Sequence, residues 1–309
     1  MGLYSAIFVY ILVFSFHPDA AMRTMGTMSI EQDIKQKALD LGFDVVGITT
    51  ADPIAIVHVD KFQQWLTDGR AGEMGYLHRN LDKRFDPAKL LAGAKSVICV
   101  ALNYRLPKDQ TPENPPVRIA RFAQYEDYHP FMKERLFQLA ECICRVGCAH
   151  ADEMKFKACV DSVPIAERAL ACRAGLGFIG RNHMLIHPEL GNQILLGELI
   201  TTLPLEPDEP MDKHPCGDCG RCIRACPTGA LAPDGSFDSR KCISYLTIEK
   251  PSDGDVIPAP EPGSTAIPSG CRIKSGMTDR EADCTKENYK NYIFGCDECI
   301  LSCPHELNG

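Results

Sequence analysis

Seven cysteines in two runs near the C-terminal end, with an eighth between the runs, limit what this chain can fold into more than any other feature. The runs are Cys216-x2-Cys219-x2-Cys222-x3-Cys226-Pro and Cys296-x2-Cys299-x3-Cys303-Pro. The first spacing is typical of bacterial two-cluster ferredoxins, in which the fourth cysteine of a run binds the neighbouring cluster. The two runs therefore predict a ferredoxin-like unit that holds two 4Fe–4S clusters and transfers electrons.

The second run is one cysteine short of a full set, and Cys242, in the segment between the runs, is the obvious replacement. The exchange of the fourth ligand then divides the eight cysteines into two sets of four. One predicted cluster is held by Cys216, Cys219, Cys222 and Cys303, and the other by Cys226, Cys242, Cys296 and Cys299. Thiolates are the expected ligands because soft sulfur suits iron–sulfur cubes.

Two zinc knuckles are the competing interpretation, because zinc sites also use paired cysteines. Zinc sites require neither a third cysteine at this spacing nor a proline after the last one, so the runs favour clusters. A disulfide scaffold is typical of short secreted chains, whereas this chain has 309 residues and 16 cysteines. The remaining cysteines lack any such spacing, and we expect most of them to be small buried apolar residues.

Charge and the N-terminal segment bear on partners and location. A net charge of −8 argues against a protein that coats nucleic acid without specificity, although a local basic patch is compatible with it.

Residues 7–16 form an apolar run, but no Lys or Arg precedes it and it is too short to span a bilayer. We expect residues 1–28 to be a disordered extension or a mis-assigned start, with an export signal as the alternative, and the protein to be cytoplasmic without stable membrane association.

Residue patterns after this segment predict alternating helices and strands. Ser29 and Gln32 have the form of a capping box that begins a helix ending at Gly42. Short segments rich in Val and Ile predict strands, and apolar residues at helical spacing predict helices. The expected strands are 43–49, 95–102 and 156–160, and the expected helices lie around 62–66, over 130–146 and from Pro164 onward.

This alternation predicts an α+β protein whose first domain, residues 29–205, is a layered α/β domain. Residues 203–215 are rich in proline and acid and read as a linker to a cysteine-rich domain, residues 206–309. Within that domain, a stretch rich in Pro, Gly and Ser predicts an exposed loop insert at about 251–288.

Four segments, taken with the cysteine runs, resemble epoxyqueuosine reductases, the cobalamin-dependent enzymes that complete queuosine in tRNA. They are residues 74–104, 120–136, 160–186 (VDSVPIAERALACRAGLGFIGRNHMLI) and 241–249 (KCISYLTIE). The string VDSxPxxERxxAxxAGLGxIG joined to CxxCxxCxxxCP is far more specific than any single motif here. The resemblance covers most of residues 29–250 and 289–304.

The resemblance implies a nitroreductase-like, cobalamin-binding domain in front of the two clusters, a fold related to reductive dehalogenases. A reduced donor such as flavodoxin or ferredoxin would supply electrons, which would pass through the clusters to cobalamin. The implied reaction reduces epoxyqueuosine to queuosine in a tRNA anticodon stem-loop, and the implied protein is a monomer. The sequence shows no cobalamin-binding motif such as DxHxxG, so that cofactor depends on the resemblance alone.

In that family the aspartate of the VDS string is the proposed proton donor, which is Asp161 here. The residues point to a site at this position independently. Asp161 stands where a predicted strand ends and a predicted helix begins, the edge at which α/β proteins usually bind ligands. The alternative interpretation is a helix N-terminal cap.

The resemblance also implies that further residues contact cobalamin, namely Tyr128, His129, Ser162, Gly175, Gly177 and Gly180. The glycines follow a predicted helix instead of opening one after a strand, so a dinucleotide-binding fingerprint does not apply. A helix C-cap with a tight turn is the alternative for the glycines. Tyr128 and His129 are alternatively an ordinary surface pair.

Two other functions stay open on the sequence. A dehalogenase-like cobalamin reductase of a small molecule would share the cofactors. An iron–sulfur electron carrier or cobalamin-handling protein would have no substrate of its own and no use for a proton donor at Asp161.

Overall fold

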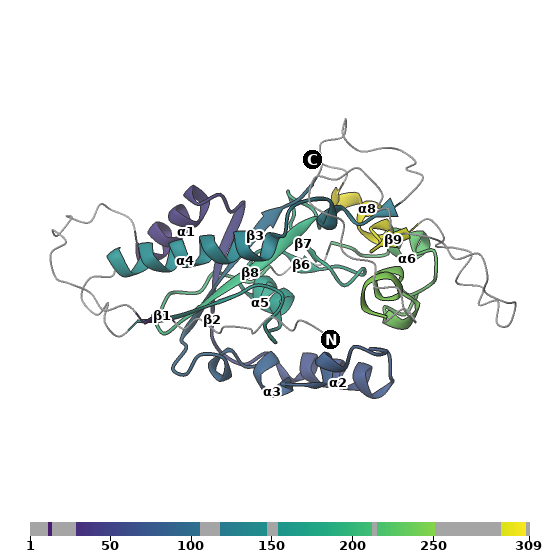
Figure 1. The fold of residues 1–309 in the computed structure, drawn as a ribbon, viewed down its shortest axis with the longest axis horizontal. Coiled ribbons are helices and arrows are strands. Elements are labelled where there is room, and N and C mark those ends of the chain that lie inside the picture. Colours follow the sequence, from purple (N-terminus) through teal and green to yellow (C-terminus); the bar gives the residue numbers. More distant parts are fainter. Residues whose placement is uncertain are drawn as a thin grey trace, which may run out of the picture.

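A five-stranded antiparallel sheet organises the larger part of the computed structural model, which describes residues 12–13, 29–105, 118–146, 154–211, 215–250 and 292–306 (Figure 1). Its strand order is β1 (Leu12–Val13), β5 (Lys155–Cys159), β8 (Ile194–Thr201), β3 (Ser96–Asn103) and β2 (Val45–Thr50). Every neighbouring pair in this sheet is antiparallel. The protein is therefore α+β as predicted. Its main sheet pairs antiparallel strands that lie far apart in the sequence and contains no parallel βαβ unit.

Helices cover both faces of the sheet and bury its two rows of side chains. On one face, α1 (Ile30–Asp40) contributes Ile34 and α4 (Tyr128–Val146) contributes Leu136 to a core with Ile98 and Leu199 of the sheet. On the other face, α5 (Glu167–Arg173) packs Leu170 and Ala171 against Val97 and Ile200. Successive strand residues alternate between these two cores, as the pleat requires. Each fully buried leucine or isoleucine stabilises the fold by about 1.5–3 kcal/mol.

The local signals for the first helix are confirmed. The side chains of Ser29 and Gln32 exchange hydrogen bonds with each other's backbone N–H at the start of α1. Gly42, at a φ of 91°, follows the end of the helix. The predicted helix around 62–66 is α2 (Ile56–Thr67). The capping box and the positive-φ glycine are short-range features, which is why they could be read without the fold.

The helix predicted to begin at Pro164 begins instead at Glu167, so that prediction is wrong by three residues. The intervening residues form a bend, and the Glu167 carboxylate accepts a hydrogen bond from the backbone N–H of Asp161 at 2.7 Å. The side chain of the first helical residue thus stabilises the preceding loop and leaves Pro164 outside the helix. Proline suits a first helical turn but does not force one.

Short elements complete the described chain. They are η1 (Gly75–His78), α3 (Leu81–Arg84), η2 (Pro87–Lys89), β4 (Arg118–Ile119), η4 (Arg121–Gln124), β6 (Phe178–Ile179), β7 (Leu185–Ile186), α6 (Arg221–Ala225), η6 (Ser239–Lys241), η7 (Tyr245–Glu249), β9 (Tyr292–Phe294), α8 (Glu298–Leu301) and η8 (Pro304–Glu306). The cysteine-bearing elements α6 and α8 lie together at one end of the molecule (Figure 1).

Strand pairing and side-chain bonds hold this cysteine-rich part against the large sheet-containing part. β9 pairs in parallel with β4, which comes from the larger part. Arg118 forms an ion pair with Glu298, and the backbone N–H of Arg121 donates to Asp297 Oδ2 at 2.6 Å. The indole N–H of Trp65 donates to the carbonyl of Phe237 at 2.7 Å. The two parts therefore share an interface built from several chain segments.

The proline- and acid-rich segment predicted as a linker packs on the large part over residues 205–208. The backbone N–H of Leu205 donates to Ser96 Oγ at 2.9 Å. Asp208 accepts from the backbone N–H of Ile48 at 2.8 Å and forms an ion pair with Lys35. The domain boundary at residue 205 stays a prediction.

The loop insert at 251–288 lies outside the described residues, as does the N-terminal extension apart from Leu12 and Val13.

The described part of the chain has no helix long and apolar enough to cross a membrane.

Candidate active site and cluster pocket

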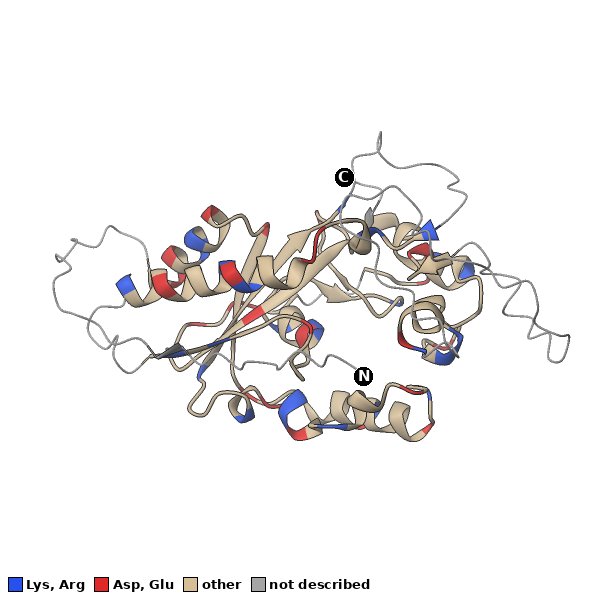
Figure 2. Cartoon of the chain, viewed as in Figure 1, with Lys and Arg blue, Asp and Glu red and all other residues tan. Residues whose placement is uncertain are grey.

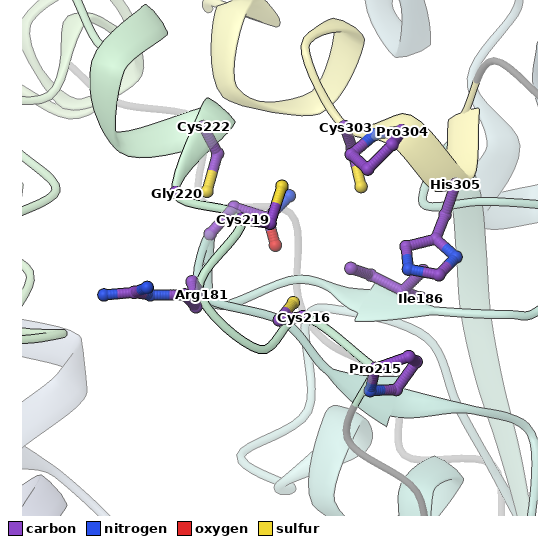
Figure 3. Close-up of a pocket in the computed structure, with 11 residues that line it drawn as sticks. Arg181, Ile186, Pro215, Cys216, Cys219, Gly220, Cys222, Cys303, Pro304 and His305 are labelled. Atoms are coloured by element: carbon purple, nitrogen blue, oxygen red, sulfur yellow. The ribbon is translucent and has the colours of Figure 1, made fainter.

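Four of the cysteines predicted to hold one cluster line a single pocket. They are Cys216, Cys219, Cys222 and Cys303, and Figure 3 shows their sulfur atoms turned toward a common space. The same pocket is also lined by Arg181, Ile186 and His305. The structure thus brings Cys303 from the second run to three cysteines of the first, and the assignment of these four to one cluster stays a prediction.

Backbone conformation explains how three cysteines so close in sequence reach one pocket. Gly217 and Gly220 adopt left-handed φ angles of 44° and 56°, which glycine tolerates without strain. They turn the chain between successive cysteines before α6 begins at Arg221. Cys303 comes from the end of α8, directly before Pro304 and η8.

The other four cysteines also lie within electrostatic range of one another. Burial raises the pKa of the Cys299 thiol, and the nearby thiols of Cys296, Cys242 and Cys226 raise it further, followed by Cys222 of the first set. Cys242 comes from the segment between the runs, and Ser244 Oγ accepts a hydrogen bond from the Cys296 N–H at 3.1 Å. Across the described ranges no three His, Cys, Asp or Glu side chains converge on a single metal ion.

Asp161 lies beyond the end of β5 with a left-handed backbone, at a φ of 51°. This conformation is uncommon for a residue other than glycine, and such strain is concentrated at functional sites. Its side chain is 64% exposed, which leaves it open to a ligand. The N-terminal cap of α5 is Ala166, so the interpretation of Asp161 as that cap is wrong. The ligand-binding rule for parallel sheets does not account for its position either, because this sheet is antiparallel.

Tyr128 and His129, at the start of α4, contact Asp161, and Asp127 contacts His129. His129 Nε2 lies 3.3 Å from Asp161 Oδ2, and His129 Nδ1 lies 2.7 Å from Asp127 Oδ1. The ring of Tyr128 stacks on that of His129 with 4.1 Å between centroids. Ser162 Oγ, beside Asp161, lies 3.5 Å from Lys133 Nζ. Tyr128, His129, Asp161 and Ser162, predicted from separate sequence segments, therefore form one surface, which we call the Asp161 site.

Electrostatics at the Asp161 site shift the pKa values of three groups around Asp161. The hydrogen bond to Asp161, with help from Asp127, raises the pKa of His129. Burial raises the pKa of the Glu167 carboxyl to about 7, with a further contribution from the charge of Asp161. Burial, followed by the charge of Asp161, also raises the pKa of Tyr128. Asp127 and Glu167 were not predicted from the sequence, because their role depends on contacts with Asp161.

Glu167 should make stability depend on pH. Its pKa is raised from 4.5 to about 7 on folding, so between these values the folded protein binds more protons than the unfolded chain. The free energy of unfolding should therefore fall as pH rises through this window, by at most about 1.4 kcal/mol for each pH unit. Glu167→Gln should flatten this dependence in thermal unfolding midpoints measured from pH 4.5 to 8. Glu141→Gln, an exposed change on α4, should leave it as in the wild type.

The three glycines predicted to contact cobalamin are explained by contacts within the protein. Gly175, at a φ of 77°, follows α5, and a Cβ there would lie 2.6 Å from the carbonyl oxygen of Glu209. A Cβ on Gly177 would lie 2.2 Å from the carbonyl oxygen of Ile186, and one on Gly180 2.4 Å from Ile186 Cδ1. The C-cap and turn interpretation therefore accounts for Gly175, close packing against Ile186 accounts for Gly177 and Gly180, and the contact of all three with cobalamin stays a prediction.

Gly177→Ala should test this explanation. The added methyl would collide with backbone that cannot move freely, so we expect a loss of about 3 kcal/mol in the free energy of unfolding. The loss should appear in urea unfolding both with and without cobalamin. Gly75→Ala, where nothing lies within 4 Å of the added methyl, is the control and should change stability by less than about 0.5 kcal/mol. A Gly177→Ala protein of normal stability that loses only cobalamin affinity would contradict the packing explanation.

Comparison with known proteins gives consistent matches. A family model described as "Epoxyqueuosine reductase QueG, DUF1730" matches residues 84–162, and one described as "4Fe-4S double cluster binding domain" matches residues 215–273. An epoxyqueuosine reductase of Cyclobacterium marinum is 37% identical over 274 residues, which cover 88% of this chain and 78% of the relative.

Solved structures give the same result. An epoxyqueuosine reductase from Streptococcus thermophilus matches with a TM-score of 0.72 and 32% identity, over 91% of this chain and 67% of that one. An epoxyqueuosine reductase with an epoxyqueuosine-modified tRNA-Tyr stem loop matches with a TM-score of 0.72 and 29% identity, over 90% of this chain and 65% of that one. The present chain thus spans about two thirds of the length of these two proteins.

Proposed function

Because the chain belongs to the epoxyqueuosine reductase family, we propose that it reduces epoxyqueuosine to queuosine in tRNA with electrons passed through two 4Fe–4S clusters to cobalamin. The observation that carries the proposal is the 37% identity to a family member over 88% of this chain. The reaction removes the epoxide oxygen as water and leaves a double bond, so it consumes two electrons and two protons. The chain must therefore bring an electron path and a proton donor to one place.

The electron path is proposed to run through the eight cysteines in their two sets. The pocket formed by Cys216, Cys219, Cys222 and Cys303 supports the first cluster, and the match to a double-cluster domain supports iron–sulfur clusters over zinc. Cys222 of the first set and Cys226 of the second both act electrostatically on Cys299. The two clusters would accordingly be neighbours, which suits electron transfer between them.

Cobalamin is proposed to bind at the Asp161 site. When bound, it supplies a strongly reducing cobalt centre to the substrate. The side chains of Tyr128, His129 and Ser162 fit such a group, because they form a partly exposed polar surface around a carboxylate on strained backbone. The packing of Gly175, Gly177 and Gly180 gives no separate support for it.

Asp161 is proposed to donate a proton to the epoxide oxygen. His129 Nε2 faces its Oδ2, and the Tyr128 hydroxyl is also hydrogen-bonded to the Asp161 side chain, so both side chains would position the carboxyl. Asp127 holds the other nitrogen of the same imidazole and so fixes its orientation. General acid catalysis by a positioned carboxyl contributes about 10²–10⁴-fold to a reaction of this kind.

The substrate is proposed to be a tRNA stem loop carrying epoxyqueuosine, because a solved family member is described with such a stem loop. Lys and Arg alternate with Asp and Glu on α1 and α4 (Figure 2), and the net charge is −8. Docking would therefore depend on local contacts around the Asp161 site instead of a broad positive face. A reduced flavodoxin or ferredoxin as donor, a monomeric state and a cytoplasmic location are part of the same proposal.

Anaerobic reconstitution tests this function. The protein is loaded with iron, sulfide and cobalamin and assayed with a reduced flavodoxin on an anticodon stem-loop bearing epoxyqueuosine. We expect about eight irons per chain and conversion to queuosine. Bound cobalamin and intact clusters without product would favour a cobalamin reductase of a small molecule. Zinc in place of iron would overturn the proposal.

A further inference from the structure

The segment 241–249 (KCISYLTIE) contains more than the proposed ligand Cys242. It ends in η7, a single turn of π-helix, a form that is rare and that occurs mostly at functional sites. Its polar side chains form hydrogen bonds with residues that lie far away in the sequence. These bonds join the segment both to the second cysteine run and to the large sheet-containing part of the chain.

Two hydroxyl groups of this segment hold the backbone around Cys296. Ser244 Oγ accepts the backbone N–H of Cys296 at 3.1 Å, and Thr247 Oγ1 accepts that of Gly295 at 2.9 Å. Ser244 stands two residues after Cys242 in the sequence. The segment therefore holds one proposed ligand of the second cluster, Cys296, beside the backbone that carries another, Cys242.

Two other side chains of the segment join it to the large part. Tyr245 is buried, and its hydroxyl accepts the backbone N–H of Glu73 at 2.8 Å. The hydroxyl of Tyr76 donates to Glu249 Oε1 at 3.2 Å. The backbone that carries Ser244 is thus anchored both to the second cysteine run and to the large part, so the position of the Ser244 hydroxyl is well defined.

The two hydroxyls differ in what their protons do. Thr247 accepts one backbone N–H and donates its own proton to the carbonyl of Ile243 at 2.7 Å, so both of its functions are used. Ser244 also accepts, but its O–H proton has no acceptor among the residues that the structure describes. A half-buried hydroxyl favours a second partner. The sulfur atoms of a cluster held by Cys242 and Cys296 would provide one.

We propose that Ser244 donates its O–H proton to a sulfur atom of the second cluster and thereby raises the reduction potential of that cluster. Reduction adds negative charge to a cluster, so a donated hydrogen bond stabilises the reduced form more than the oxidised one. The Cys296 N–H is already bonded to Ser244 Oγ, which leaves the hydroxyl proton as the one to be donated. This inference rests on the proposed function only for the presence of the second cluster.

A redox titration of the full chain, reconstituted with iron, sulfide and cobalamin, tests the inference. The second cluster is identified as the electron paramagnetic resonance signal that Cys242→Ala lacks. Ser244→Ala should keep its iron, since Thr247 still holds the neighbouring backbone. Reduction of the second cluster should become about tenfold less favourable, a shift of about 59 mV to lower potential for one electron. Ser244→Thr keeps a hydroxyl and should restore the wild-type potential.

Thr247→Val is the matched control, because the proton of this hydroxyl is already bonded to the carbonyl of Ile243. It should leave the potentials of both clusters as in the wild type. An unchanged potential in Ser244→Ala, or an equal shift in Thr247→Val, would overturn the inference even if queuosine is formed. Zinc in place of iron in the wild type would overturn the proposed function as well.

A measurement on the wild type decides the matter if Ser244→Ala loses the second cluster. Electron–nuclear double resonance of the reduced protein, frozen shortly after transfer to heavy water, should detect a deuteron coupled to the second cluster. Buried backbone N–H groups exchange more slowly than a hydroxyl, so an early signal reports the hydroxyl. Thr247→Val should retain this signal. Absence of the early deuteron from the wild type would overturn the inference.

Discussion

Asp161→Asn is expected to lower turnover by about 10²–10⁴-fold while leaving iron content and cobalamin binding intact. The amide has nearly the same shape as the carboxyl and can still face His129, but it has no acidic proton to give. Asparagine also adopts left-handed backbone readily, so the φ of 51° at this position should be kept. The loss would therefore report proton donation and not a change in structure.

Two comparison variants make this result interpretable. Glu141→Gln removes the same charge from an exposed position on α4 and should retain wild-type turnover. Asp161→Ala removes the carboxyl but tolerates the left-handed backbone poorly, so it should lose stability as well as turnover. Full activity in Asp161→Asn would show that the proton comes from another group. A loss of cobalamin together with turnover would instead indicate a binding role. An electron carrier without a substrate would have no such dependence on Asp161.

The sequence could predict features whose cause is local. The capping box of Ser29 and Gln32 and the helix end at Gly42 depend on residues a few positions apart. The cysteine spacing likewise assigns Cys303 to the first run, and the structure places Cys303 in one pocket with three cysteines of that run. In each case the physical cause, a short-range hydrogen bond or a ligand spacing, is contained in the segment itself.

Features that depend on distant contacts could not be read in this way. The start of α5 was misplaced because the bond between Asp161 and Glu167 outweighs the preference of Pro164 for a first turn. The segment around Asp208 reads as a linker by composition, yet it binds Ile48 and Lys35 far away in sequence. Glu198 is a single acid in an apolar strand, and only the sheet register shows that it is sealed between Cys99 and Cys159.

Cys242→Ala should have the second large effect, because Cys242 is the one proposed ligand outside the two runs. Loss of a single thiolate should release the second cluster and lower the iron content from about eight to about four per chain. Turnover should fall below detection, since the clusters act in series and the remaining one cannot pass electrons onward. Iron analysis and electron paramagnetic resonance of the reduced protein measure both outcomes.

The choice of control decides what this experiment says about ligand exchange. Cys142→Ala replaces a half-buried cysteine of α4 and should keep all of the iron. The electron paramagnetic resonance spectrum of Cys226→Ala should match that of Cys242→Ala. Cys226 belongs to the first run, but both cysteines are assigned to the second cluster. Cys303→Ala should leave the opposite spectrum, that of the second cluster alone. If Cys303→Ala matched Cys242→Ala instead, and Cys226→Ala left the opposite spectrum, each run would hold its own cluster and the crossed assignment would be wrong.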